Sequence, residues 1–556
     1  MPDNPKISNL KYLKPIGGFH GVSVVFPTLK DVFDYEEKKI KIIQGYPRFV
    51  THPLVKNLEE KFEKRFKAKG VLCCHSYESA VFFITDYYFR KGTKIYFSKG
   101  LPTKIFNLLD RKFKNLAKKS NLSHANVVIC NIEELKTNLD LKDKVLIGLV
   151  KDNSYIPKMS KKKFDILILN NKDNDIGIII FYNTLHSELN ILRRHCGFIV
   201  SSRKLVRKEN ISTKKVDFYS EKLKNNLSGL ELANSNQCFL YPSGMAAMFI
   251  AIFSIISSKK PKIIVLGSLY VDTIRILEKW FKKYDLHEPI FIRKNFLKEL
   301  KNHIDNEIAG IIFEIPSNPL IQLVNVEKVI SLAHLKNVKV IIDNTIATPY
   351  NFNPFNYNAD IIVHSTTKFL NGKNNHIGGV LLAKNKSDIK NIKKINELVD
   401  LNMCIGDMRV LARNLKHFEV RMEKINKNSE IVANYLSENE SIETVYYPTL
   451  KSDPNNLLMR KYLKGASGLI SFILKNSSFE NAEKFYNNLH LPILKGPSLG
   501  SEKTLLCPYV ILAHFNDTKQ QLKKLGLDFY LMRMSVGTEP VETILKSLKH
   551  ALSFIK

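Results

Sequence analysis

The feature of this chain that most restricts its fold is a series of short, uninterrupted apolar runs separated by lysine-rich segments. The runs are ANVVIC, KVLIGLV, FDILILN and IGIIIFY before residue 185, followed by KIIVLG, IAGIIFEIP, VKVIIDNT and ADIIVHS. Continuous Val and Ile without polar alternation is typical of strands buried on both faces of a parallel sheet. Helices between such strands cover both faces of the sheet, so the pattern predicts an α/β architecture.

The pattern of predicted helices and strands changes beyond about residue 390. One long helical pattern is followed by TVYYPTL, GLISFIL and LMRMSVG, which predict strands of a smaller α/β domain. A chain of 556 residues is long enough for several domains. We therefore expect an N-terminal extension with an arm and a partial, repeat-like α/β region (1–220), a cofactor-binding large domain (221–390) and a C-terminal small domain (391–556).

The charge and the cysteines exclude several classes of protein. The net charge of +32 comes from 85 Lys and Arg against 53 Asp and Glu, spread along the whole chain. Without an RNP-type aromatic motif, zinc-finger spacing or a basic region with heptads, solvated lysine surfaces explain it better than nucleic-acid binding. Seven cysteines without a C-x-x-C pair favour a reducing, cytoplasmic setting and argue against a metal site. No signal-peptide core or membrane-length apolar run is present, so we expect no membrane partner.

A weak internal repeat links the two halves of the chain. NLEEKFEKRFKAKGVLCCHSYESAVFFI resembles EKLKNNLSGLELANSNQCFLYPSGMAAMFI, and aligning Ser76 with Ser243 gives a shift of 167 (243 − 76). Both segments predict a helix, a short strand, a turn of small residues and an apolar helix. A phosphate-binding turn needs exposed backbone N–H groups and little side-chain bulk, and only the second segment has the glycine, Gly244. The first segment is either a structural relic or a chance similarity.

Polar side chains follow four successive strands of the second half of the chain. They are a tyrosine, an amide, a carboxylate and a lysine: Tyr270, Asn318, Asp343 and Lys368. Each alone would be an ordinary core or surface residue. In an open α/β sheet, however, the carboxyl ends of the strands line the ligand crevice. A carboxylate that emerges from an apolar run also needs a cationic or donor partner. Together the four residues predict a site.

Pyridoxal phosphate requires this combination of groups. A lysine amine binds its aldehyde covalently, and a carboxylate keeps the pyridine nitrogen protonated so that the ring accepts electrons. An amide donor bonds the phenolic oxygen, an aromatic ring stacks on the cofactor, and backbone N–H groups with hydroxyls bind the phosphate. The same lysine can transfer protons once a substrate has displaced it from the cofactor.

The motifs SGMAA, LYVDT, PSNP, DNT and STTK resemble the Cys/Met-metabolism family of pyridoxal-phosphate enzymes, over roughly residues 220–556. This family includes cystathionine synthases and lyases, methionine γ-lyase and homoserine-ester sulfhydrylases. The interval of 25 residues (368 − 343) from Asp343 to Lys368 agrees with it. Other segments, among them HGVSVVFPTLKDVFDYEE, GYPRFVTHP and RRHCGFIVSSR, resemble the long, fungal-type cystathionine γ-synthases, which carry an N-terminal extension.

The resemblance implies a fold and an assembly. The fold is the type I, aspartate-aminotransferase-like fold: a large domain with a mixed, mostly parallel sheet and a small C-terminal α/β domain, here with an N-terminal extension. The family forms homodimers or homotetramers with sites at subunit interfaces, and its partners are small-molecule substrates.

The resemblance also implies roles for individual residues. Lys368 binds the cofactor and transfers protons, Tyr270 stacks on the ring as the second catalytic residue, and Asp343 pairs with the pyridine nitrogen. Asn318 lies near the phenolic oxygen and the substrate carboxylate. The phosphate is bound by Gly244, Met245, Ser365 and Thr367, and the substrate by Ser498 and Arg533.

The family takes a further Tyr-x-Arg from a neighbouring subunit to the phosphate, and two arginines fit this role. Arg48, with Tyr46, lies 28 residues before Ser76 (76 − 48), and Arg203 lies 40 residues before Ser243 (243 − 203) without a tyrosine. The loop NGKNNHIGG departs from the family, because Lys373 stands where histidine is usual and His376 is unusually placed. These departures loosen the assignment of the substrate more than that of the cofactor.

The reaction we expect is that of a cystathionine γ-synthase in methionine biosynthesis: cysteine replaces the γ-ester group of an activated homoserine. The leaving group, whether acetyl, succinyl or phosphate, is left open. The alternative is a sulfhydrylase, or a cystathionine or methionine lyase, with the same site. One sequence does not show pocket differences as small as a methylene group, which separate these substrates. The alternative from another class is a catalytically silent basic scaffold or a nucleic-acid-binding protein.

Overall fold

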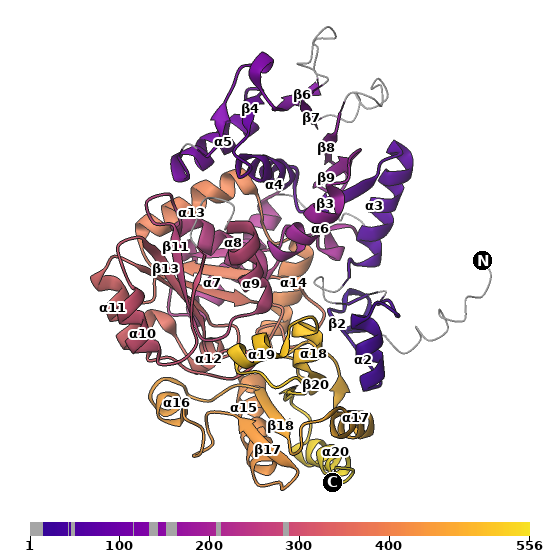
Figure 1. The fold of residues 1–556 in the computed structure, drawn as a ribbon, viewed down its shortest axis with the longest axis vertical. Coiled ribbons are helices and arrows are strands. Elements are labelled where there is room, and N and C mark those ends of the chain that lie inside the picture. Colours follow the sequence, from indigo (N-terminus) through magenta and orange to yellow (C-terminus); the bar gives the residue numbers. More distant parts are fainter. Residues whose placement is uncertain are drawn as a thin grey trace, which may run out of the picture.

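The computed structural model describes residues 15–42, 44–45, 50–114, 116–132, 143–151, 164–206, 213–281 and 288–555. Figure 1 shows the N-terminal part (residues 50–206) at the top, the central part (213–414) below it and the C-terminal part (418–555) at the bottom. None of the helices in the described ranges is long and apolar enough to span a bilayer.

The central part is built on a seven-stranded mixed sheet with the order β10-β16-β15-β14-β13-β11-β12. Strand β16 runs antiparallel to both of its neighbours, and the other neighbours are parallel. The strands are β10 (Cys238–Tyr241), β11 (Lys262–Leu266), β12 (Ile290–Ile292), β13 (Ile308–Glu314), β14 (Lys339–Asp343), β15 (Ile361–Ser365) and β16 (Gly379–Ala383). The predicted α/β fold with a mostly parallel sheet is confirmed.

Both faces of this sheet are covered by helices, which explains the uninterrupted apolar runs. Alternate residues of one strand point to opposite faces. Ile263 and Val265 therefore belong to a core with α8 (Gly244–Ile255) and α13 (Lys386–Val399). Ile264 and Leu266 belong to the core on the other face, with α7 (Thr213–Leu230) and α11 (Val326–Leu335). The remaining helices of this part are α9 (Val271–Arg275), α10 (Phe296–His303), α12 (Thr348–Asn351) and α14 (Ile405–Asn414).

The N-terminal part contains a second seven-stranded sheet, with the order β3-β9-β8-β7-β6-β4-β5. Here β9 is antiparallel to both neighbours and the other pairs are parallel. The strands are β3 (Gly70–Cys74), β4 (Lys94–Phe97), β5 (Lys118–Lys119), β6 (Val127–Asn131), β7 (Val145–Val150), β8 (Ile166–Asn171) and β9 (Ile176–Phe181). The helices are α3 (Pro53–Phe66), α4 (Tyr77–Phe89), α5 (Leu101–Lys112) and α6 (His186–His195).

The C-terminal part is a five-stranded sheet with the order β17-β18-β21-β20-β19, covered by helices. Its strands are β17 (Ile442–Tyr446), β18 (Leu469–Leu474), β19 (Leu494–Lys495), β20 (Leu505–Pro508) and β21 (Met532–Ser535). Its helices are α15 (Phe418–Ser437), α16 (Asn456–Tyr462), α17 (Phe479–Asn488), α18 (Tyr509–His514), α19 (Lys519–Leu525) and α20 (Val541–Leu552).

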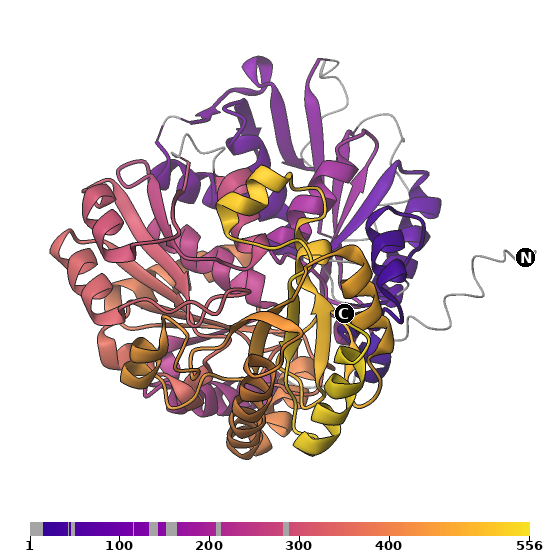
Figure 2. The ribbon, with the colours of Figure 1, turned by 60° about the horizontal axis from the view of Figure 1, so that its bottom comes forward.

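The first described segment of the chain packs on this C-terminal part. It comprises the two-stranded sheet of β1 (Pro15–Ile16) and β2 (Ser23–Val24), followed by α2 (Leu29–Glu36). The buried side chain of Phe26 joins the C-terminal core, and the hydroxyl of Tyr486 donates to the backbone oxygen of Phe26 at 3.1 Å. Figure 2 shows the C-terminal part, drawn in orange to yellow, in front of the central part.

Candidate active site

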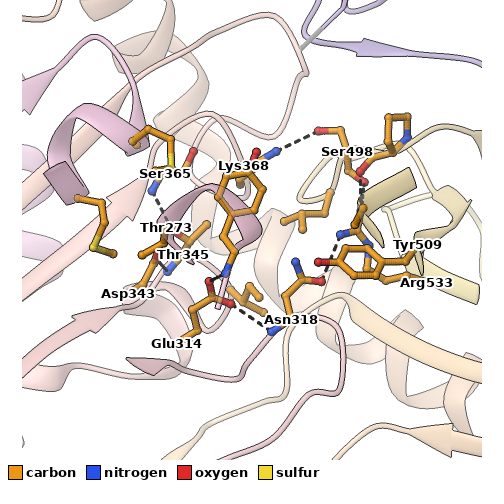
Figure 3. Close-up of a pocket in the computed structure, with 18 of the residues that line it drawn as sticks. Thr273, Glu314, Asn318, Asp343, Thr345, Ser365, Lys368, Ser498, Tyr509 and Arg533 are labelled. Atoms are coloured by element: carbon orange, nitrogen blue, oxygen red, sulfur yellow. Dashed lines mark hydrogen bonds between the residues drawn. The ribbon is translucent and has the colours of Figure 1, made fainter. Parts of the chain in front are cut away.

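A cavity lies between the carboxyl ends of the central strands and the C-terminal part (Figure 3). All of the predicted site residues except Thr367 line it: Gly244, Met245, Tyr270, Asn318, Asp343, Ser365, Lys368, Ser498 and Arg533. The chain thus brings together residues that are up to 289 positions apart (533 − 244).

Lys368 lies in the turn that follows β15. Its backbone N–H donates to the oxygen of Ser365 at 3.2 Å, and its amine donates to the hydroxyl of Ser498 at 3.3 Å. The loop that carries Ser498 approaches this turn closely at Gly500, whose φ is +77°. A Cβ atom there would lie 2.4 Å from the backbone nitrogen of Phe369, so only glycine fits. This packing fixes the lysine against the C-terminal part.

The start of α8 forms an anion-binding end of the cavity. Ser243 caps the helix by accepting from the N–H of Ala246 at 3.1 Å. A Cβ atom at Gly244 would lie 2.7 Å from the Cβ of Ser365, so glycine is what allows the helix start and the end of β15 to meet. The hydroxyl of Ser365 is buried and has no hydrogen-bond partner among the described residues. An unpaired buried hydroxyl beside a helix N-terminus fits a phosphate group.

Thr367 is the exception among the predicted residues. Its side chain is buried, accepts from the N–H of Gly378 at 3.1 Å and does not line the cavity. This hydrogen bond stabilises the loop between β15 and β16. Its predicted contact with the phosphate stays a prediction.

Two carboxyl groups lie side by side in the cavity, buried Glu314 and half-buried Asp343. Asp343 ends β14, and its Oδ1 accepts from the N–H of Thr345 at 3.0 Å. Glu314 ends β13 opposite Asp343 and accepts from the N–H groups of Tyr270 and, at 3.1 Å, Asn318. Burial raises the pKa of Asp343, while burial and then repulsion from Asp343 hold the pKa of Glu314 well above its ordinary value. Adjacent carboxyls of this kind favour a cationic ligand, and a protonated pyridine nitrogen fits here.

Arg533 projects from β21 into the same cavity. Its Nη1 donates to Oδ1 of Asn318 at 3.2 Å, and its Nη2 donates to the backbone oxygen of Ser498 at 3.3 Å and to that of Pro497. The guanidinium also lies 4.8 Å from the ring centre of Tyr509. These contacts hold a planar cation in one orientation, which suits bidentate binding of a carboxylate.

Several residues that line the cavity were not predicted, among them Glu314, Thr345 and Tyr509. Glu314 ends an apolar run as Asp343 does, so the same signal was present in the sequence. Thr345 accepts from the N–H of Ser365 at 2.8 Å and thereby joins the ends of β14 and β15. Tyr509 carries no local signal, because its position depends on how the C-terminal part packs on the central sheet.

The two candidates for the extra phosphate arginine have different outcomes. Tyr46 and Arg48 lie outside the described residues. Arg203 does not line the cavity; its Nη1 donates to Oδ1 of Asp407 at 3.0 Å. His376, the unusual residue of the loop after Lys368, is buried beside Thr366 and the same Asp407.

Comparison with known proteins identifies the family of this chain. Residues 208–553 match the family described as "Cys/Met metabolism PLP-dependent enzyme". The chain is 33% identical over 337 residues to an L-methionine gamma-lyase of Fusobacterium nucleatum subsp. polymorphum, covering 60% of this chain and 83% of that protein. It is 30% identical over 323 residues to a cystathionine beta-lyase of Lactococcus lactis subsp. cremoris, covering 58% and 83%.

Solved structures agree on the fold. The crystal structure of metB from Corynebacterium glutamicum superposes with a TM-score of 0.55 at 28% identity, covering 60% of this chain and 84% of that one. The predicted type I fold and the predicted cofactor, pyridoxal phosphate, are confirmed. The chain therefore belongs to the Cys/Met-metabolism family of pyridoxal-phosphate-dependent enzymes.

Proposed function

We propose that this enzyme is a cystathionine γ-synthase, which replaces the γ-substituent of an O-activated homoserine by cysteine. The observation that carries the proposal is the position of Ser498 between two groups. Its hydroxyl accepts from the amine of Lys368 at 3.3 Å, and its backbone oxygen accepts from Arg533 at 3.3 Å. An amino acid whose carboxylate is bound by Arg533 would thus present its Cα and Cβ to Lys368.

The chain's own residues would have the following roles. Bound pyridoxal phosphate supplies an electron sink for charge that develops on the substrate. The start of α8 and Ser365 would hold its phosphate, Tyr270 its ring face and Asp343 its ring nitrogen. Arg533 orients the substrate carboxylate. The amine of Lys368 accepts the proton from Cα and moves protons at Cβ, which allows the γ-substituent to leave.

The apolar part of the cavity wall favours a thiol over water as the second reactant. Met248, Leu499 and Leu512 line it and are buried. Apolar walls exclude water and so reduce hydrolysis of reactive groups. The resemblance of the N-terminal segments to the long cystathionine γ-synthases supports the synthase in particular.

A lyase is the second candidate, because the curated relatives with 33% and 30% identity are a methionine gamma-lyase and a cystathionine beta-lyase. A lyase would use the same lysine, carboxylate and arginine. It would differ only in its substrate and in needing no second substrate.

The product formed tests the proposal. The purified protein with pyridoxal phosphate is incubated with O-acetyl-, O-succinyl- or O-phosphohomoserine, each with cysteine, with sulfide or alone, and separately with methionine and with cystathionine. Mass spectrometry should detect cystathionine only when both an ester and cysteine are present. Faster release of a ketoacid from methionine or cystathionine would assign the lyase. Homocysteine from an ester and sulfide, without cystathionine from the same ester and cysteine, would assign the sulfhydrylase. Lys368→Ala should abolish each activity, whereas Lys336→Ala, at an exposed position, is the matched control.

A further inference from the structure

The two seven-stranded sheets have the same strand order, and several equivalent strand pairs have the same register. In β3 and β9, Cys74 pairs with Gly177, and in β10 and β16, Tyr241 pairs with Gly379. The difference of 167 (241 − 74) equals the shift that aligns Ser76 with Ser243. The backbone pairing therefore reproduces an alignment first suggested by the sequence.

The paired glycines occupy the same environment in both sheets. A Cβ atom at Gly177 would lie 2.4 Å from the backbone oxygen of Ser76. A Cβ atom at Gly379 would lie 2.3 Å from the backbone oxygen of Ser243. Each serine caps the helix that follows, α4 or α8. The N-terminal part has thus kept the joint between the last strand and the start of the helix.

The N-terminal sheet has lost the groups that would contact a cofactor. Ile147 pairs with Ile166 as Ile341 pairs with Ile361, so Leu149 takes the place of Asp343. Tyr77, which is buried, takes the place of Gly244 at the helix start (244 − 167 = 77).

The loop that carries the lysine is also missing from the N-terminal sheet. Its counterpart, between β8 and β9, is the short hairpin 172–175, in place of residues 366–378. With no carboxylate, no glycine turn and no lysine loop, the first copy has no cofactor site of its own among the described residues.

The two copies contact each other in a two-fold manner. Ser76 donates to the backbone oxygen of Asp400 at 2.9 Å, and Ser243 donates to that of Gly197 at 3.4 Å. Asp400 and Gly197 follow α13 and α6, and both have left-handed backbones, with φ of +46° and +75°. Helix α13 packs on α4 and α5, and α6 packs on α9 and on the π-helical segment Ile276–Trp280 that follows it. Each copy therefore packs the helix that follows its last strand against the other copy, as in an isologous dimer.

Equivalent aromatic residues meet in the middle of this interface. Phe82 and Phe249 are 167 residues apart (249 − 82), and their ring centres lie 6.5 Å apart in an edge-to-face arrangement. Phe198 stacks on Phe82 at 6.0 Å and contacts Phe249 at 5.2 Å. All three side chains are fully buried in one core that includes residues of both sheets. Figure 1 shows α4 between the N-terminal and central parts.

We propose that residues 50–206 are a second large domain that has lost its own cofactor site. This domain serves as a built-in second subunit for the site around Lys368. Its direct contribution is Gly197, at the phosphate end. A Cβ atom there would lie 2.4 Å from the backbone nitrogen of Ala246 and 2.5 Å from the hydroxyl of Ser243. The first copy thus positions the N–H groups of the helix start that line the cavity. This role is independent of which reaction the enzyme performs.

The test is cofactor affinity in the full-length protein, measured by the absorbance change when the cofactor-free protein is titrated with pyridoxal phosphate. Gly197→Ala should weaken binding at least tenfold, because the new methyl group displaces the start of α8. Gly18→Ala is the matched control, since Gly18 has the same backbone strain (φ +77°) but nothing within 4 Å. It should bind within about twofold of wild type. Equal affinity of the two variants would overturn the proposal.

A second pair of variants covers the case in which Gly197→Ala does not fold. Phe82→Leu alters the interface between the copies, whereas Phe106→Leu alters a buried ring that packs on Phe89 and Phe97 inside the first copy. Phe82→Leu should weaken cofactor binding, and Phe106→Leu should lower only the unfolding temperature. Saturation should occur at one pyridoxal phosphate per chain, and Lys368→Ala should leave no covalently bound cofactor. Two cofactors per chain, or equal effects of both phenylalanine variants on affinity, would refute the built-in subunit.

Discussion

Replacement of Arg533 by lysine isolates the recognition of the substrate carboxylate. The guanidinium is held by Asn318 at 3.2 Å and by the backbone oxygens of Pro497 and Ser498, so its planar fork has one orientation. Lysine keeps the charge but has a single nitrogen, which cannot satisfy these acceptors and a bidentate carboxylate together. We expect the substrate to lose one charge-assisted hydrogen bond.

The size of the loss follows from this geometry. A hydrogen bond to a charged group contributes about 1.5–3 kcal/mol. Since about 1.4 kcal/mol corresponds to a tenfold change, Arg533→Lys should raise the dissociation constant of an amino acid about 10- to 150-fold. The assay is the change in cofactor absorbance on titration with L-methionine. Affinity for pyridoxal phosphate itself should stay the same, because the cofactor contacts we assign do not include Arg533.

The matched control is a ligand rather than a protein variant. L-Methioninamide has the same side chain but no carboxylate, so its weaker binding should change little between wild type and Arg533→Lys. The two perturbations together form a double-mutant cycle that isolates the arginine–carboxylate interaction. If the variant weakens the acid and the amide equally, Arg533 acts on the shape of the cavity and the proposed role is wrong.

Three further variants test the other groups of the site and its support. Lys368→Ala should lower turnover by about 10²–10⁴-fold or more, because it removes the proton-transfer group, whereas Lys336→Ala should leave turnover unchanged. The assay is steady-state product formation in excess cofactor. Turnover of Lys368→Ala near that of wild type would exclude Lys368 as the base. Asp343→Asn should flatten the pH dependence of the cofactor-free protein. The pKa values of Asp343 and Glu314 are raised on folding, so the folded state retains protons that the unfolded state has released, and the free energy of unfolding should fall as pH rises from about 4; urea unfolding between pH 5 and 8 should show a shallower fall in the variant, and parallel curves would contradict it. Asp407→Asn should destabilise the protein by about 3–5 kcal/mol near neutral pH, because it leaves the largely buried guanidinium of Arg203 without its counter-charge. Although burial opposes it, hydrogen bonding and charge hold the pKa of Asp407 well below its ordinary value, so this difference should shrink as pH falls below about 4, and a difference that persists in acid would argue against the ion pairs.

Much of the site was predictable because its signals are local. Asp343 and Lys368 each follow an uninterrupted apolar run, and the geometry of parallel strands brings such positions to one edge of the sheet. Gly244 and Ser365 were predictable for the same reason. The direction of the Thr367 side chain was not, because it depends on a hydrogen bond to Gly378 across the loop.

The extent of the duplication could not be read from the sequence. Only the segment around Ser76 retains side chains that resemble the second copy, since the helix start and the close approach of Gly177 still constrain them. The later strands keep only their apolar character, because a buried strand accepts many combinations of Val, Ile and Leu. Leu149 for Asp343 is an example in which the side chain changed and the strand pairing did not.

A built-in second subunit also changes how the enzyme should respond to dilution. When a site is completed by a separate chain, its population depends on protein concentration through mass action. Here the contacts of Ser76 with Asp400 and of Ser243 with Gly197 form within one chain, so their effective concentration is fixed by the fold. With excess pyridoxal phosphate, cofactor loading and specific activity should therefore stay constant from about 10 µM down to about 10 nM protein. Further association of chains through other faces would not alter this result, because it leaves the start of α8 unchanged. Loading that falls on dilution and recovers on concentration would mean that a second chain, rather than the first copy, completes the site.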